Sequence, residues 1–432
     1  MAVAVEVFDV SRAPTLPADP LLATSSATVE LHSSRSISIS DIAVALAFAL
    51  LAGLVVWNVQ RSMDARFFVA PGGNDVWFEA DLPTVADTVL HRWSVQSRNA
   101  RHPLFPLLAT GSAYGLRAAG LTDRSILALL SATAAAAWVA LFFSIARSIT
   151  TRQSDAIVFT LLACSTSSAM FWLTVPETYT LGSVTLLVPL ALTAMDAERR
   201  LPEGAYVAAS AVSMSVTSTN WMCGICAAVA RWPWRRALQI SINAVFVVGV
   251  IWAVQRIIFP TAPFFFGYSN EGRFVLPAAS GGPGPVARAL FFHTIVMPRI
   301  DLIPEPKWGT VMSVQHSSIA SSGAWGVAAT IGWAALVATA LVGLASSRGN
   351  ARVRLVLFGT LAGQVLLHLL YGEETFLYAV HVAPLLVLTA ALGSVSRWRR
   401  VILVIAVVLA CTAAMNNVRQ LETALSFFSR TS

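Results

Sequence analysis

Long stretches without a charged residue constrain this chain more than any other feature. They are Ile42–Gln60, Ser125–Ala146, Ala156–Pro176, Thr178–Met195, Gly204–Ala230, Ala237–Gln255, Ser317–Ser347, Leu355–Gly372, Thr375–Ser396 and Val401–Val418. Most are long enough to cross a hydrocarbon core of ~30 Å at ~1.5 Å per residue. Of all residues, 56% are hydrophobic and only 12% are charged, which excludes a soluble enzyme. We predict an all-α polytopic membrane protein with about ten to eleven transmembrane helices.

The apolar runs divide the chain into five parts. They are a disordered cytoplasmic tail (1–40), an N-terminal transmembrane core (41–258) with an external loop (62–102), a large external loop (259–322), C-terminal transmembrane helices (323–418) and a tail (419–432). The first part carries no apolar run or cleavage site of a signal peptide. The preference for arginine over lysine indicates a high-GC bacterial genome, so we expect a multi-pass protein of the plasma (inner) membrane.

Arginine clusters between the apolar runs predict the orientation, because cytoplasmic loops carry the excess of basic residues. The clusters are Arg147/Arg152, Arg199/Arg200, Arg231/Arg235/Arg236, Arg348/Arg352/Arg354 and Arg397/Arg399/Arg400. All five share the cytoplasmic side if Pro103–Gly120 does not cross the membrane and Gly204–Ala230 is a hairpin that turns near Asn220. The C-terminus is then external. If Pro103–Gly120 crosses and Gly204–Ala230 is a single helix, two clusters fall outside.

The external loop 62–102 holds most of the candidate chemistry. Asp75 and Glu79 follow the first apolar run, and an amphipathic helix with a face for the membrane interface is predicted from Asp81 to Arg98. Two arginines and a histidine come next (Arg98, Arg101 and His102). A carboxylate suits proton removal from an acceptor hydroxyl, and cations suit neutralisation of a phosphate leaving group. The alternative is that the acids only solvate the loop.

This loop resembles that of the GT-C glycosyltransferases, which include protein O-mannosyltransferases and bacterial aminoarabinose transferases. The likeness covers about residues 41–200 and lies in the acid after the first helix, the amphipathic helix and Arg101-His102-Pro103-Leu104. It implies a catalytic Asp in the loop, a polyprenyl-phosphate sugar donor and reaction on the external face. Many members show an adjacent acidic pair, whereas this chain has Asn74-Asp75 with Glu79 four residues on. Either Asp75 or Glu79 is therefore the candidate base.

Further candidates stand at the predicted outer ends of other helices. In the resembled family, a polar residue at the place of Pro176-Glu177-Thr178-Tyr179 faces the substrate, which makes Glu177 and Tyr179 candidates. The alternative is that Glu177 caps the next helix. Asn220, at the hairpin tip, is a candidate for sugar binding, with packing between helices as its alternative.

The second half of the chain adds four candidates for substrate binding. Glu374, Tyr378 and His381 share one stripe if the segment is an α-helix, and ionisable groups at such depth usually face a cavity. Arg273, in the loop 259–322, is a candidate for the lipid phosphate; the alternatives are that Lys307 binds it or that the loop selects the acceptor. We expect no metal and no other cofactor, because no compact set of His, Asp and Glu ligands is visible. Cys223-x-x-Cys226 is interpreted as small residues in a buried helix.

The leading hypothesis is therefore a glycosyltransferase that uses a polyprenyl-phosphate sugar donor and a lipid, glycan or protein acceptor at the bilayer surface. Nucleic acid is not an expected partner, since the arginines follow the membrane topology. One alternative is an O-antigen polymerase or ligase, which works mainly through basic residues in external loops. The other alternative is a lipid or solute transporter, although no internal repeat or matching pair of broken helices supports it.

Overall fold

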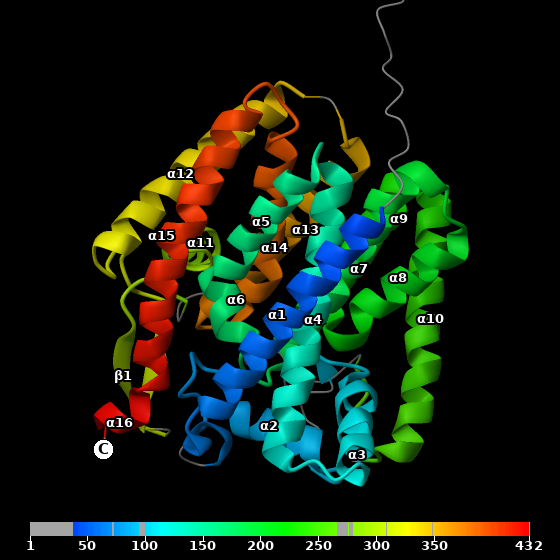
Figure 1. The fold of residues 1–432 in the computed structure, drawn as a ribbon. Coiled ribbons are helices and arrows are strands. Elements are labelled where there is room, and N and C mark those ends of the chain that lie inside the picture. The colour runs from blue at the N-terminus through cyan, green and yellow to red at the C-terminus, as the bar shows by residue number, and fades with distance from the viewer. Residues whose placement is uncertain are drawn as a thin grey trace, which may run out of the picture. The chain divides into compact units, whose positions relative to one another are not determined.

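A computed structural model shows the chain as a bundle of helices (Figure 1). The structure describes residues 38–70, 73–94, 100–265, 275, 280–307, 309–347 and 349–431. In these ranges seven segments are long and apolar enough to cross a membrane: α1 (Ile39–Ser62), α4 (Asp123–Ile149), α7 (Thr178–Arg199), α10 (Trp234–Ile258), α12 (Ala324–Ala345), η8 (Thr375–Tyr378) with α14 (Ala379–Gly393), and α15 (Arg399–Leu425). The predicted class, an all-α polytopic membrane protein, is confirmed.

Shorter or more polar helices lie between these seven segments. They are α5 (Gln153–Ser165), α6 (Ser167–Trp172), α8 (Glu203–Val216), α9 (Trp221–Arg231) and α13 (Ala351–His368). The predicted total of about ten to eleven crossings requires these helices in addition to the long ones. Helices α8 and α9 pack against each other across the turn η5 (Ser218–Asn220), so the predicted hairpin near Asn220 is confirmed.

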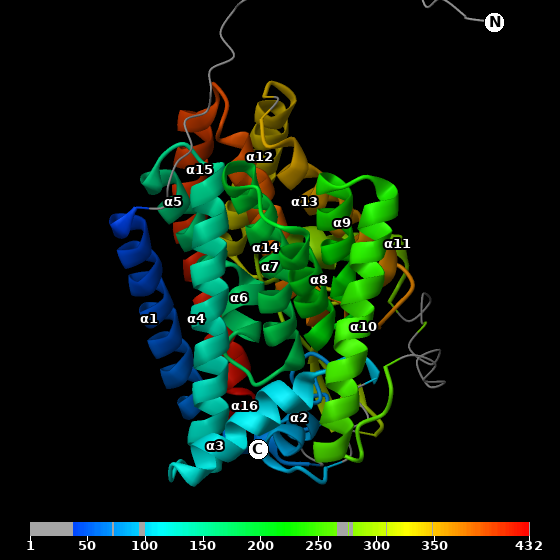
Figure 2. The same cartoon turned by 90° about the vertical axis from the view of Figure 1, so that its right-hand side faces the viewer.

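The connections that carry the arginine clusters lie together at the upper end of the bundle in Figures 1 and 2. Four clusters send an arginine to a buried carboxylate there: Arg147 to Asp41 (2.6 Å), Arg231 and Arg352 to Asp196 (2.9 and 3.2 Å), and Arg399 to Asp155. A buried carboxylate needs such a partner, so these pairs tie neighbouring helix ends together. The predicted gathering of arginines at one end is confirmed, and its assignment to the cytoplasm stays a prediction.

The opposite end carries the non-helical segments and the shorter surface helices (Figure 1). Here lie η2 (Ala65–Phe68), α2 (Leu82–Leu90), η4 (Pro106–Thr110), α3 (Gly111–Ala118), the antiparallel hairpin of β1 (Asp301–Glu305) and β2 (Gly309–Ser313), and α16 (Phe427–Thr431). The helical segment α11 (Pro283–Arg288) and η7 (Ala289–His293) precedes the hairpin. The backbone N–H of Met312 donates to the carbonyl of Val76 at 3.0 Å, which joins the two predicted loops.

Helix α2 corrects the prediction of a longer interfacial helix from Asp81 to Arg98. It ends at Leu90, where the N–H of His91 closes the last turn on the carbonyl of Asp87. Its apolar side chains pack on α3 and α4, and Val85 is fully buried there. The face that the hydrophobic spacing revealed is therefore covered by protein and not by the membrane interface.

The segment Pro103–Gly120 forms one short helical stretch of η4 and α3. Pro106–Ala118 would span about 20 Å at the usual rise, which is shorter than a hydrocarbon core of about 30 Å. The stretch starts with a π-helical turn that begins at Pro106, whose backbone nitrogen carries no hydrogen and cannot donate a hydrogen bond. This length supports the prediction that the segment does not cross.

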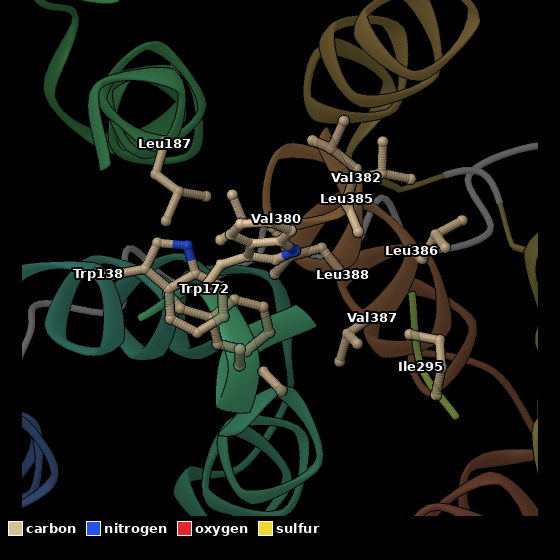
Figure 3. Packing of buried hydrophobic residues seen from close by; sticks show 14 of the residues in the cluster. Trp138, Trp172, Leu187, Ile295, Val380, Val382, Leu385, Leu386, Val387 and Leu388 are labelled. Carbon is tan, nitrogen blue, oxygen red and sulfur yellow. The ribbon is translucent and has the colours of Figure 1, made fainter. Parts of the chain in front are cut away.

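Helix α14 lies at the centre of the hydrophobic core (Figure 3). Its membrane segment is 94% buried within the protein, whereas that of α1 is 17% buried, so α1 is peripheral. Polar side chains also fix the core: Trp138 donates to Ser183 at 2.8 Å, and Ser183 donates to the carbonyl of Val380 at 2.6 Å. These bonds hold the start of α14 against α4 and α7, next to the loop end.

Close packing between α12 and α14 gives a first prediction. A Cβ atom on Gly393 would lie 2.6 Å from the carbonyl oxygen of Ala340, so Gly393→Ala forces the helices apart. We expect this change to lower the free energy of unfolding by about 1–3 kcal/mol, measured as a lower thermal midpoint in detergent. Gly249→Ala in α10 is the matched control, because no atom lies within 4 Å of its Cβ position. An equal midpoint for both variants would contradict the packing argument.

Candidate functional site

The turn after η2 holds two of the candidate acids in a strained backbone conformation. Asp75, Phe78 and Glu79 have φ angles of 58°, 51° and 59°. Non-glycine residues in this region cost of order 1–3 kcal/mol each, and such strain clusters at functional sites. The turn is held by the buried rings of Trp77 and Phe78, which pack edge-on to each other and contact an aromatic cluster that includes Phe67, Phe171, Trp172 and Phe376. The surrounding core therefore maintains the unfavourable turn.

Glu79 meets Glu374, which lies at the start of the segment that leads into α14. The backbone N–H of Glu374 donates to Oε2 of Glu79 at 3.1 Å. Burial, together with the charges of Glu374, Glu373 and Asp75, raises the pKa of Glu79 to about 8. Glu79 is therefore mostly protonated at neutral pH, which sequence analysis did not anticipate.

Glu374 is fully enclosed and is surrounded by hydrogen-bond donors. Its Oε2 accepts from Ser313 Oγ (2.6 Å) and from the N–H groups of Val314 (3.1 Å) and Gln315 (3.3 Å). Its Oε1 accepts from the N–H of Phe376 at 3.4 Å. Burial raises the pKa of Glu374, but these donors oppose the rise because they favour the ionised form. Of the two adjacent acids, Glu79 accepts the fewer of these bonds.

A cavity of about 230 Å³ lies between the end of α13 and the start of the η8–α14 segment. It brings together five of the predicted substrate-binding residues, which come from the segment before η4, from α7 and from the start of α14: Arg101, His102, Tyr179, Tyr378 and His381. Its remaining walls are Ala100, Thr217, Ser218, Thr219, Phe265, Gln364, Leu367, His368 and Tyr371. The cavity thus combines cationic, hydroxyl-bearing and aromatic side chains.

Aromatic contacts fix the walls of this cavity. The ring of Tyr378 lies 4.1 Å from that of His368, stacked, and 5.1 Å from that of Tyr179, edge-on. His381 holds the start of α7 through its Nε2, which lies 3.1 Å from the carbonyl oxygen of Tyr179. These side chains come from three helical segments, so the cavity keeps its form only while the helices stay packed.

The segment with Arg101 and His102 is fixed against the end of α8. The N–H of Leu104 donates to the carbonyl of Ser215 at 2.7 Å, and the N–H of Ser218 donates to the carbonyl of Arg101 at 2.9 Å. Between these bonds, Nδ1 of His102 donates to the carbonyl of Val216 at 2.6 Å. The last carbonyls of a helix have no partner within it, and here they position the predicted basic residues.

The predicted stripe of Glu374, Tyr378 and His381 is not formed. Residues 375–378 are a 3₁₀ turn, and Glu374 is its N-cap, with a side chain that accepts from the N–H of Phe376. Only Tyr378 and His381 line the cavity, whereas Glu374 turns to the β2 end and to Glu79. The prediction was wrong because it assumed one continuous α-helix from residue 374 onward.

Glu177 and Asn220 do not line this cavity. Glu177 caps α7, and its Oε1 accepts from both the N–H (2.9 Å) and the hydroxyl (2.7 Å) of Thr178. Asn220 is buried between helices, donates to the carbonyl of Gly182 at 2.9 Å and accepts from Gln364 at 3.2 Å. The structure thus shows the capping and packing alternatives for these two residues.

Two predicted residues, Arg98 and Arg273, lie outside the described residues. The residues of the site that were missed include Ser313 and Gln315, which bind Glu374, and Gln364, His368 and Tyr371, which line the cavity. His368 and Tyr371 flank the end of α13, where a histidine and a tyrosine close an apolar run, and this was a usable signal. Nothing in the local sequence marked Ser313 or Gln315.

Within the described ranges, no three His, Cys, Asp or Glu side chains converge to hold a metal ion. Cys223 and Cys226 lie in α9, where Cys223 is buried and its thiol donates to the carbonyl of Leu186, as the interpretation of small buried residues implies. Comparison with known proteins finds no family model and no curated protein that matches this chain. The functional argument therefore depends on the geometry of the site.

Proposed function

We propose that this protein is an integral-membrane glycosyltransferase of the GT-C type that uses a polyprenyl-phosphate sugar donor on the external face of the plasma membrane. The cavity at the loop end is the observation that carries this proposal. It places Arg101 and His102 beside hydroxyl-bearing and aromatic walls. The acceptor is a lipid, a glycan or a protein.

The cavity walls match the two parts of such a donor. Guanidinium and imidazole groups suit the phosphate, which carries the charge that must be stabilised when it leaves. The hydroxyls of Thr217, Ser218 and Thr219 and the amide of Gln364 suit sugar hydroxyls. The tyrosine rings supply apolar faces for the sugar ring. The apolar helices below the loop end provide the place for the polyprenyl chain.

Asp75 is the base in this proposal, and Glu79 is not. A base must be ionised before it accepts a proton, and the raised pKa of Glu79 keeps that group mostly protonated at neutral pH. Asp75 takes the proton of the acceptor hydroxyl while the acceptor oxygen forms a bond to the anomeric carbon. The bond from that carbon to the phosphate oxygen breaks, and the electron pair leaves with the polyprenyl phosphate.

A donor panel tests the proposed function. The purified protein in liposomes is offered polyprenyl phosphates with different sugars, together with an extract of membrane lipids and glycans as acceptors. We expect release of polyprenyl phosphate from at least one donor. Release from none of them, combined with no detectable donor binding by well-folded protein, would overturn the proposal.

The cavity cation gives a separate prediction for the donor site. Arg101→Gln removes the guanidinium while keeping a polar side chain, so we expect binding of the donor phosphate to weaken at least tenfold. Arg92→Gln, in the same loop but outside the cavity lining, is the control. Binding of a short isoprenyl phosphate, followed by tryptophan fluorescence, measures both variants. Unchanged affinity for Arg101→Gln would place the phosphate elsewhere.

A further inference from the structure

Three side chains form a buried chain of hydrogen bonds that ends at the cavity. His102, Thr178 and Glu177 are each at most 3% exposed. Nε2 of His102 lies 3.2 Å from the hydroxyl of Thr178, and that hydroxyl lies 2.7 Å from Oε1 of Glu177. The cap of α7 is thereby connected to a residue that lines the cavity.

The direction of each hydrogen bond follows from the number of protons available. Nδ1 of His102 faces a backbone carbonyl, which only accepts, so Nδ1 carries a proton. The hydroxyl of Thr178 has a single proton and two neighbours, Glu177 and Nε2 of His102. The contact with Glu177 is the shorter of the two, and hydrogen bonds to a carboxylate are the stronger kind.

If the Thr178 proton goes to Glu177, then Nε2 of His102 must donate to the Thr178 oxygen. Both ring nitrogens then carry protons, and the ring is an imidazolium. We propose that Glu177, acting through Thr178, holds His102 as a buried cation that gives the cavity a fixed positive charge for a phosphate ester. The inference rests on the proposed function only for the identity of that anion.

The other groups around His102 decide how strongly Glu177 and Thr178 must favour its protonated form. Arg101 is adjacent in the chain and lines the same cavity, so its charge opposes protonation of the ring. Tyr179 lies edge-on with its ring centre 5.5 Å away. The ring of Phe105 lies at a tilt to that of His102, with their centres 6.4 Å apart. Glu177 is the anion that compensates, so it is a positioning residue and not a catalytic one.

This arrangement explains why the cavity contains two kinds of cation. The ring nitrogens of His102 are both used within the protein, so the residue contributes charge and no hydrogen bond to a ligand. Arg101 contributes donors as well as charge. Together they suit a phosphate monoester or diester better than a neutral ligand. A neutral histidine would add no positive charge to the cavity.

Nitrogen NMR of the ring tests the inference without any sugar donor. The full chain is labelled at its seven histidines, and the His102 signals are identified by their loss in His102→Asn. We expect two ring N–H protons on His102 at pH 7.5, and a protonation midpoint about one pH unit lower in Glu177→Gln. A singly protonated ring in the wild-type protein at pH 6.5 would overturn the inference.

Two further variants distinguish the effect of the hydrogen-bond chain Glu177–Thr178–His102 from the effect of removing any negative charge. Glu203→Gln removes an acid at the start of α8, where it faces Arg236 on the surface, and should leave the His102 midpoint unchanged. Thr178→Val removes the connecting hydroxyl and should lower the midpoint as Glu177→Gln does. An equal protonation midpoint of His102 in all of these proteins would also overturn the inference. If the His102 signals behave as expected while no donor is used, only the proposed function fails.

Discussion

Replacing Asp75 by asparagine is expected to lower the rate of sugar transfer by about 10²- to 10⁴-fold while leaving the protein folded. The amide cannot take the proton of the acceptor hydroxyl, so the step that forms the glycosidic bond loses its base. Asparagine tolerates the positive φ of 58° at this position, so the turn keeps its conformation. Release of polyprenyl phosphate measures the rate, and the thermal midpoint checks the fold.

The control for Asp75→Asn is Asp87→Asn on α2. Asp87 is an exposed acid of the same loop, paired with His91 at 2.8 Å, and such surface pairs contribute little. We expect its rate to stay within about twofold of the wild-type rate. If Asp75→Asn stays active while Glu79→Gln loses activity, the base is Glu79. If both acid variants are active and substitution of Arg299 abolishes activity, the polymerase alternative is favoured.

The membrane class and the arginine-rich end were predictable because each depends on composition and on residue order alone. The pairs that hold this end, such as Arg399 with Asp155, were hidden because their partners lie far apart in the chain. The hairpin of α8 and α9 was also predictable, since a charge-free run of 27 residues exceeds one crossing. An amphipathic helix at the position of α2 was predicted correctly. Its shorter length and its packing against α3 and α4 were not predicted.

The site was predictable in its residue types and less so in its grouping. Arg101, His102, Tyr179, Tyr378 and His381 meet in one cavity because polar residues at successive helix ends lie at the same end of the bundle. Glu374 was placed with the wrong group, since a 3₁₀ turn changes the direction of its side chain. Ser313 could not be found, because it lies 61 residues before the carboxylate that it binds.

Glu79→Gln is expected to make the protein more stable at alkaline pH and to leave it unchanged in acid. The pKa of Glu79 is about 8 in the folded protein against an ordinary value of 4.5. Between these two values the folded chain binds more protons than the unfolded chain, so the free energy of unfolding falls as the pH rises. Below about pH 4.5 both states are protonated and the penalty is absent. Above about pH 8 the penalty is complete, and we expect it to reach about 3–5 kcal/mol.

Glutamine removes the titration and keeps the local contacts. Its amide oxygen still accepts the N–H of Glu374, and its backbone has the same constraint at the positive φ. Thermal midpoints of both proteins between pH 5 and pH 9 measure the effect, with Glu305→Gln in the β1–β2 hairpin as the control. We expect the difference in thermal midpoint between Glu79→Gln and wild type to grow as the pH rises through this interval. The difference between Glu305→Gln and wild type should stay constant. A constant difference for Glu79→Gln would mean that Glu79 is ionised in the folded protein, and Glu79 would then compete with Asp75 for the role of base.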